Sequence, residues 1–372
     1  MPSAGTAAPR VGLIPSLDGL RALSVGIVFW AHAHLPGDMR GGTGVTVFFF
    51  LSGYLITTLM RVEHDRFDRI SLKDFYLRRV LRIFPPMYIA IALGVLLTVV
   101  GALTAPVTAG GLAASAFFFA NYWKIAGLEG IPDGLGVLWS LAVEEHYYLL
   151  FPLLYVLLRK YLPNRVHQAI LLAAVCCGVL AWRCWLIFEA GAGSVRVYYG
   201  TDTRIDGILL GAIFAIMLNP VYGEFKLPTR WLLPALASIS AVAFATFMFV
   251  RVVDTPEAYT WGYTVQGLAL IPIFAYVITR PTSWVGRILN WKPIAFLGVL
   301  SYVMYLVHVP FLRSAEHLLQ LPHKVEVGIA ALATFLFAWG VNRSVERPLA
   351  RLRKKLSHAG ESTTLLPSTA AR

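Results

Sequence analysis

Apolar runs long enough to cross a bilayer recur along the whole 372-residue chain, separated by short polar segments rich in Gly, Pro and charge. A transmembrane helix needs roughly 20 mostly apolar residues. The pattern therefore predicts an all-α integral membrane protein with about ten transmembrane helices, and residues 110–122 are long enough for only a partial one. The predicted spans lie near residues 20–35, 44–60, 84–103, 141–158, 169–188, 205–218, 230–250, 262–279, 295–313 and 325–342.

Composition agrees with this class, because 57% of the residues are hydrophobic and only 14% are charged, against roughly 25% charged residues in soluble domains. The net charge of +12 is typical of nucleic-acid binders, but its distribution favours a membrane. Most basic residues lie in alternate connections, on the same side as the N-terminus. Since cytoplasmic loops are enriched in Lys and Arg, we expect both termini and residues 61–82 and 280–294 to be cytoplasmic, residues 104–138 and 251–261 to face outward, and no nucleic-acid partner.

The chain divides into three parts by composition. Residues 1–15 form a cytoplasmic N-terminal segment, 16–348 the transmembrane domain, and 349–372 a basic cytoplasmic tail that is expected to be disordered. The N-terminus lacks the basic region of a secretory signal, so we expect no cleaved signal peptide. No second, soluble domain is expected within this sequence.

The first span carries ionisable residues that a lipid-facing helix does not need, and such residues are by default functional. Arg21 and His32 are eleven residues apart, which places them on one helix face about 16 Å apart. Arg21 then lies near the cytoplasmic end and His32 in the outer half of the membrane. The structural alternative is a snorkelling arginine and a histidine bonded to a neighbouring helix. His34 lies ~200° from His32 around the helix, so we expect no shared metal site.

Three arginines, Arg78, Arg79 and Arg82, stand at the cytoplasmic start of the third span. They are either membrane anchors or a binding site for phosphate groups, which arginine recognises well. Arg78 and Arg82 share a helix face, and Arg79 lies close to it. Ser52, in the second span, is interpreted as bonding its own helix backbone and as offering, with Gly53, a small surface for close helix packing.

Carboxylates occur at the outer ends of two spans. Glu144 and Glu145 lie at the predicted outer entrance of one, where burial requires a partner or a water-filled cavity. Asp202 and Asp206 share a face of another, with Arg204 on the opposite face. We interpret these three residues first as a structural ion-pair network and second as part of a substrate channel.

His308 is predicted to lie inside the ninth span, one helical turn after Tyr305. The sequence leaves two interpretations open. His308 is either a core histidine whose hydrogen bonds are satisfied by its neighbours, or a catalytic partner.

These stretches together resemble the acyltransferase type 3 family of membrane O-acyltransferases. The resemblance rests on Arg21, within "LDGLRA", and on His32 eleven residues later, and it covers residues 16 to 348 in the family's order. One position departs, since His146 stands where the family commonly has glutamine. The sequence also shows none of the extracellular hydrolase-like domain that some members append. The other matching stretches are "FFFLSGYLIT", "RRVLRIFP", "WSLAVEEHYYLLFP", "DTRIDGILLG", "SYVMYLVH" and "VERP".

The resemblance implies about ten helices and transfer of an acyl group from acyl-CoA, most often acetyl-CoA, to a hydroxyl on a glycan, glycolipid or glycosylated natural product in a bacterial plasma membrane. It also implies that Arg21 and His32 are the functional pair. Because a thioester is already activated, the chemistry mainly needs a base for the acceptor hydroxyl, a role that neutral histidine suits. Arg21, Arg78, Arg79 and Arg82 are then the expected coenzyme A ligands, and His32, Arg21, Glu144, Glu145 and His308 the candidate catalytic residues.

The sequence leaves the route of the acyl group and an alternative function open. The acyl group could pass directly to the acceptor or through a covalent acyl-histidine. The alternative function is a polytopic transporter or flippase, in which the same intramembrane charges serve a proton or substrate path. No inverted repeat is visible in the sequence to support that alternative.

Overall fold

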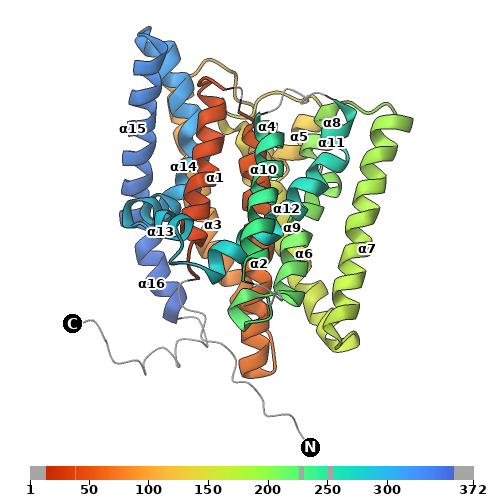
Figure 1. Cartoon of the computed structure of the whole chain (residues 1–372). Helices are drawn as coiled ribbons and strands as arrows, with labels where there is room; N and C mark the ends of the chain where they lie inside the picture. The colour runs from red at the N-terminus through yellow and green to blue at the C-terminus, as the bar shows by residue number, and fades with distance from the viewer. Residues whose placement is uncertain (1–13, 38, 226–229, 250–254, 356–372) are drawn as a thin grey trace, which may run out of the picture.

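The computed structural model describes residues 14–37, 39–225, 230–249 and 255–355. Throughout these ranges the regular structure is helical (Figure 1). The helices are α1(Leu17–His32), α2(Gly41–Phe67), α3(Leu72–Val99), α4(Ala109–Ala116), α5(Ala120–Ile125), η1(Leu135–Val137), α6(Leu138–Tyr161), α7(Arg165–Cys184), η2(Trp185–Glu189), α8(Ser194–Tyr199), α9(Thr201–Met217), η3(Pro220–Tyr222), α10(Leu232–Phe249), α11(Pro256–Tyr259), α12(Trp261–Thr279), α13(Trp284–Leu289), α14(Lys292–Leu319), α15(His323–Val341), η5(Asn342–Glu346) and α16(Arg347–Lys355).

Each of the ten predicted spans corresponds to one helix of the described chain, and the prediction of a polytopic all-α membrane protein is confirmed. Eight of these helices are long and apolar enough to cross a membrane. The other two are shorter: α1 has 16 residues, and the apolar part of α10 runs from Leu232 to Met248. The predicted partial span at residues 110–122 is instead broken into α4 and the start of α5.

The long helices run between two ends of the molecule, which we name the Arg21 end and the His32 end after the two ends of α1 (Figure 1). At the Arg21 end, the backbone N–H of Ser16 donates to Asn290 Oδ1 at 2.8 Å. At the His32 end, the N–H of Arg40 donates to the carbonyl of Met248 at 3.2 Å. This arrangement fits ten alternating crossings, while the assignment of the Arg21 end to the cytoplasm stays a prediction.

Some of the predicted segments and loop charges fall on residues that the structure does not describe. Residues 1–13 and 356–372, the basic residues Arg10 and Lys226, and the outward segment up to residue 254 lie outside the described residues. The tail predicted to be disordered from residue 349 is corrected in its first part, because residues 349–355 belong to α16. The sequence "RPLARLRKK" supplies Leu, Ala, Arg and Lys, which are good helix formers.

Helices α2 and α9 approach each other closely at the centre of the bundle. A Cβ atom at Gly53 would collide with the carbonyl oxygen of Ile208, and one at Gly211 would collide with that of Phe50. Small residues allow this approach in membranes, where close packing holds helices together. The prediction that Gly53 provides a close-packing surface is therefore confirmed, and it places α9 beside the helix that carries Ser52.

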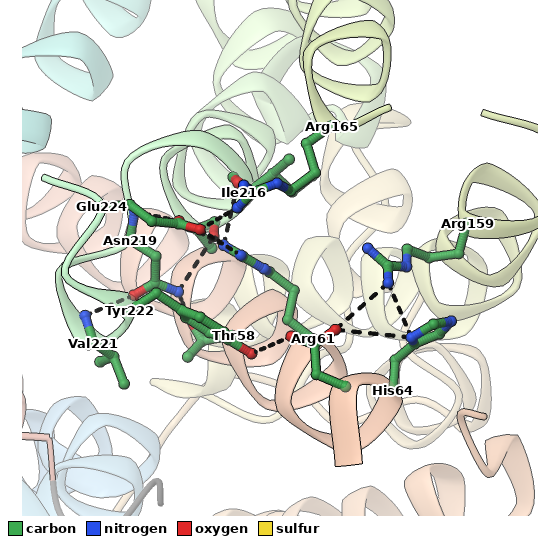
Figure 2. Close-up of polar contacts among 12 residues, drawn as sticks. Thr58, Arg61, His64, Arg159, Arg165, Ile216, Asn219, Val221, Tyr222 and Glu224 are labelled. Atoms are coloured by element: carbon green, nitrogen blue, oxygen red, sulfur yellow. Dashed lines mark hydrogen bonds and ion pairs between the residues drawn. The ribbon is translucent and has the colours of Figure 1, made fainter. Parts of the chain in front are cut away.

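A polar network closes the Arg21 end where α2, α7 and the α9–α10 connection meet (Figure 2). The Arg61 guanidinium, almost fully buried, donates to Glu224 Oε1 at 2.8 Å and to backbone carbonyls at the end of α9. Arg165 also pairs with Glu224, and Asn219 donates to Thr58 Oγ1 at 2.9 Å. Burial alone would raise the pKa of Glu224, but the hydrogen bond from Arg61 and the two positive charges outweigh it and lower that pKa.

Candidate active site

Two histidines from opposite ends of the sequence meet inside the bundle. His32 is the last residue of α1, and His308 lies in the middle of α14, fully buried. The two rings are 5.0 Å apart between centroids, and His308 Nε2 lies 3.1 Å from His32 Nδ1. Helices α1 and α14 pack side by side (Figure 1), which brings together two candidate residues that are 276 positions apart in the chain.

The hydrogen bonds assign the proton positions on both rings. His308 Nδ1 lies 2.7 Å from the carbonyl oxygen of Tyr305, and a carbonyl can only accept, so His308 carries its proton on Nδ1. Its Nε2 is then an acceptor. His32 Nδ1 lies 3.0 Å from the carbonyl of Val28 and must also carry its proton there. The remaining nitrogen, His32 Nε2, makes no hydrogen bond to the described residues and presents a free lone pair.

His32 lines a cavity of 500 Å³ at the His32 end, which we name the outer cavity. Its floor is aromatic, with Trp139, Tyr198 and Tyr199 from α6 and α8. These rings contact one another, with Trp139 and Tyr198 centroids 4.8 Å apart. The segment between α3 and α6 supplies the opposite wall. An aromatic floor beside a free base offers a surface on which a sugar ring can lie with a hydroxyl directed at His32 Nε2.

A second cavity, of 340 Å³, lies at the Arg21 end and is named the inner cavity. Arginines from three separate helices line it, and only some of them form ion pairs with carboxylates of the described residues. Arg21 pairs with Asp18 at 2.6 Å. Arg79 and Arg82 form no ion pair with a carboxylate of the described residues, which leaves their guanidinium groups available for an anionic ligand. The arginines lining this cavity are Arg21, Arg79, Arg82, Arg347 and Arg353.

Arg347 and Arg353 were not among the ligands predicted from the sequence. They reach the inner cavity because α15 does not continue directly into α16 but passes through the π-helical turn η5(Asn342–Glu346). The wider turn is held by Asn342, which donates to Glu346 at 2.8 Å and accepts from Arg347 at 3.0 Å. Such turns occur frequently at functional sites. The available signal was the "VERP" stretch followed by arginines at helical spacing.

Glu144 and Ser52 meet at the wall of the inner cavity. Ser52 Oγ donates to Glu144 Oε2 at 3.0 Å, and Tyr148 OH donates to the same oxygen at 2.7 Å. Two predictions are corrected here. Ser52 bonds another helix rather than its own backbone, and Glu144 lies inside the membrane domain rather than at its outer entrance. The physical reason is that α6 begins at Leu138, so Glu144 lies about 9 Å along the helix from its start.

Glu145 is the less satisfied of the two neighbouring carboxylates. Its Oε1 is buried and has no hydrogen-bond partner among the described residues. It does not line the inner cavity. The structure therefore brings Glu144, but not Glu145, to the site that holds the arginines.

Arg78 also lies away from the inner cavity. It pairs with Glu63 of α2 at 3.0 Å, whereas Arg79 and Arg82 line the cavity. The helical spacing of the arginines favoured Arg78 together with Arg82 as ligands, and this prediction is corrected. The direction in which α3 faces the cavity is set by the helices packed against it, and spacing alone does not contain that information.

The inner and outer cavities are separated by a thin partition. Val45 and Tyr305 line both cavities. The Tyr305 hydroxyl lies 2.6 Å from Ser140 Oγ and donates to the carbonyl of Val137 at 3.2 Å. Arg21 and His32, at the two ends of one continuous helix, therefore serve different cavities, with Tyr305 between them.

His34 departs from its predicted position. Helix α1 ends at His32, and His34 has φ of 47°, so helical angles do not apply to it. It lines a further cavity of 540 Å³ together with His32. No group of three or more metal-binding side chains is found in the described part of the chain.

The charged residues of α9 form the network that the sequence suggested first. Asp206 pairs with Arg183 of α7 at 2.8 Å, and both side chains are almost completely buried. Asp202 pairs with Arg196 at 2.5 Å. Arg204 instead lies over the ring of Tyr263, 3.7 Å from its centroid. None of Asp202, Arg204 and Asp206 lines the three cavities described above.

Comparison with known proteins identifies the family to which the chain belongs. The profile of the acyltransferase domain matches residues 14–343. The chain is 30% identical over 352 residues to the peptidoglycan O-acetyltransferase OatA of Listeria monocytogenes, covering 90% of this chain and 56% of that protein. It is also 30% identical over 353 residues to YrhL of Bacillus subtilis, a candidate peptidoglycan O-acetyltransferase, covering 90% of this chain and 55% of the relative.

A candidate O-acetyltransferase of Staphylococcus aureus is 31% identical over 364 residues, with 91% of this chain and 58% of the relative covered. The chain thus spans a little over half the length of these relatives. No solved structure is significantly similar to it. Since the family profile covers nearly all of the membrane helices, and relatives match over nine tenths of the chain, this protein belongs to the acyltransferase type 3 family.

Proposed function

We propose that the protein transfers an acetyl group from acetyl-CoA, bound through the inner cavity, to a hydroxyl of a glycan in the outer cavity, with His32 as the general base. The observation that carries this proposal is the free Nε2 of His32, held beside the aromatic outer cavity by a fixed tautomer. The catalytic unit is the membrane domain, residues 16–348.

The inner cavity supports an anionic donor. Coenzyme A carries several phosphate groups, and arginine binds phosphate oxygens with two parallel hydrogen bonds. Arg79 and Arg82 have no carboxylate partner among the described residues, and Arg353 lines the cavity from α16. Phosphates held there would leave the pantetheine arm and thioester to extend along α1, past Tyr305, toward His32.

The chemistry at His32 needs one proton acceptor and no metal in this scheme. His32 Nε2 takes the proton of the acceptor hydroxyl while the oxygen attacks the thioester carbonyl carbon. The new C–O bond forms, the C–S bond breaks, and the coenzyme A thiolate recovers the proton from His32. The Val28 carbonyl and His308 Nε2 both accept the Nδ1 proton of His32, so that the lone pair stays on Nε2.

The outer cavity and the relatives together favour a glycan acceptor. Trp139, Tyr198 and Tyr199 provide apolar ring faces beside the base, and the names of two relatives specify peptidoglycan. We therefore propose a bacterial cell-surface glycan of the peptidoglycan type, acetylated at the cytoplasmic membrane. Family membership also removes the reason to prefer a transporter.

The test is acetyl transfer by the purified protein with acetyl-CoA and chitotetraose or solubilised peptidoglycan fragments. Release of free coenzyme A and O-acetylated product, found by mass spectrometry, is expected from the parent. His32→Ala and His32→Gln should reduce turnover by roughly 10²–10⁴-fold, as expected for loss of a general base. His167→Ala, on the exposed face of α7, is the matched control. Near-normal turnover in both His32 variants would remove His32 from the mechanism.

A further inference from the structure

One cation in the outer cavity has no part in the scheme above. Lys124, on α5, lines this cavity together with His32. Its ammonium lies 5.0 Å from the centroid of the Tyr199 ring. No carboxylate of the described residues forms an ion pair with it.

The other charges of the cavity do not neutralise Lys124. Asp133 is paired with Arg313 at 2.8 Å, so its carboxylate is not available to neutralise Lys124. Glu129 also lines the cavity, but this residue is exposed and makes no ion pair with Lys124. An uncompensated positive charge therefore remains beside the aromatic floor.

The backbone leaves room for this ammonium group. A Cβ atom at Gly136 would lie 2.7 Å from Lys124 Nζ, so a side chain at that position would displace the lysine. Burial, and then the nearby charge of Arg313, lowers the pKa of the Lys124 ammonium. Burial and the charge of Arg313 both make an unpaired ammonium unfavourable at this position, and an anionic ligand would relieve both effects.

Resting on the proposed function, we propose that the outer cavity selects an acceptor that carries an anionic group, a carboxylate or a phosphate, beside the sugar that is acetylated. Lys124 pairs with that group, the sugar ring packs on Trp139 and Tyr199, and its hydroxyl reaches His32 Nε2. Lys124 is thus a specificity-determining residue for the acceptor and takes no part in proton transfer. A glycan without such a charge would bind the same floor more weakly.

Binding and turnover test this proposal separately. Purified parent, Lys124→Gln and Lys160→Gln are titrated by calorimetry, without donor, with three probes: chitotetraose, which is neutral, a hyaluronan tetrasaccharide, which carries carboxylates, and chitotetraose phosphorylated at its reducing end. Lys160 is the matched control because its ammonium also lies over a tyrosine ring, 5.1 Å from the centroid of Tyr161, at the far end of α6.

The parent and Lys160→Gln should bind at least one anionic probe roughly tenfold more tightly than chitotetraose, the lower range for a hydrogen bond to a charged group. The probe that shows the preference identifies carboxylate or phosphate as the recognised group. Lys124→Gln should lose the preference while its binding of chitotetraose is unchanged. Equal binding of the three probes by the parent, or no measurable binding of the anionic ones, would overturn the proposal.

A preference that survives in Lys124→Gln would also overturn it, and would leave the lysine as a packing residue over Tyr199. The proposed function fails by a different result, namely no coenzyme A release by the parent with any acceptor. Raising the salt concentration should reduce the preference, since this ion pair is partly open to solvent.

Discussion

Replacing His308 by phenylalanine distinguishes the role of His32, the proposed base, from the role of His308, which orients it. His308 is fully buried and lies among aromatic rings, with Phe29 6.2 Å and Tyr305 5.8 Å away between centroids. A phenyl ring therefore suits the site in size and polarity. The change removes the hydrogen bond between His32 Nδ1 and His308 Nε2 but leaves the one between His32 Nδ1 and the Val28 carbonyl.

The size of the effect follows from the bond that remains. The Val28 carbonyl still holds the proton on His32 Nδ1, so the free lone pair stays on Nε2. His308→Phe should therefore lose the contribution of about one ordinary hydrogen bond, roughly 0.5–1.5 kcal/mol. This corresponds to a decrease in turnover of about 2- to 12-fold. This is far smaller than the ~10²–10⁴-fold expected when the base itself is removed.

The assay is coenzyme A release at saturating donor, measured for the parent, His308→Phe, His308→Gln and His32→Ala across pH. In the parent, turnover should fall at acid pH because protonated His32 cannot act as a base. His308→Phe should show the same fall in acid, because His32 still titrates. His308→Gln should recover part of the loss, since its amide oxygen can accept from His32 Nδ1. A His308→Phe enzyme as inactive as His32→Ala, or one without this fall in acid, would refute the assignment of the two roles.

Three further predictions concern the donor, stability and topology. Arg79→Ala should raise the Michaelis constant for acetyl-CoA roughly tenfold or more, with Arg78→Ala as the matched control; equal constants in both variants contradict the donor site. Glu224→Gln should lower stability at pH 7 by roughly 1–3 kcal/mol. Because the folded pKa of Glu224 is depressed, its contribution is present above the unfolded pKa and is lost as pH falls through the folded value, so thermal unfolding of parent and variant should converge in acid. In a cysteine-free background in intact cells, an impermeant thiol reagent should label a cysteine at 256 and not one at 68; the reverse labelling inverts the orientation.

The lengths of the apolar runs were enough to predict the ten helices, because membrane spans are specified by local composition. The relation between Arg21 and His32 was also predictable, since both lie in one uninterrupted helix and helical geometry fixes their separation. That geometry failed at His34, two residues further on, because the helix has already ended there. The rotation per residue of an α-helix does not predict where a side chain lies once the helix has ended.

Other parts of the site depend on tertiary packing. The choice between Arg78 and Arg79 requires knowing how α3 is rotated against its neighbours, and the contact between His32 and His308 requires knowing that α1 packs on α14. The depth of Glu144 depends on where α6 begins. Arg347 and Arg353 enter the cavity only because of the π-helical turn at Asn342–Glu346, whereas in the sequence they are indistinguishable from basic residues that anchor a helix end.

The central claim is that donor and acceptor occupy cavities at opposite ends of the membrane domain, with Tyr305 between the two cavities and His32 on the acceptor side. Proteoliposomes test it directly. Labelled acetyl-CoA, which does not cross the bilayer, is trapped inside or supplied outside, and chitotetraose is supplied on the same or on the opposite side. The account predicts acetylated product only when donor and acceptor are on opposite sides, whichever way the protein is inserted. Product formed only when both are on the same side would contradict it.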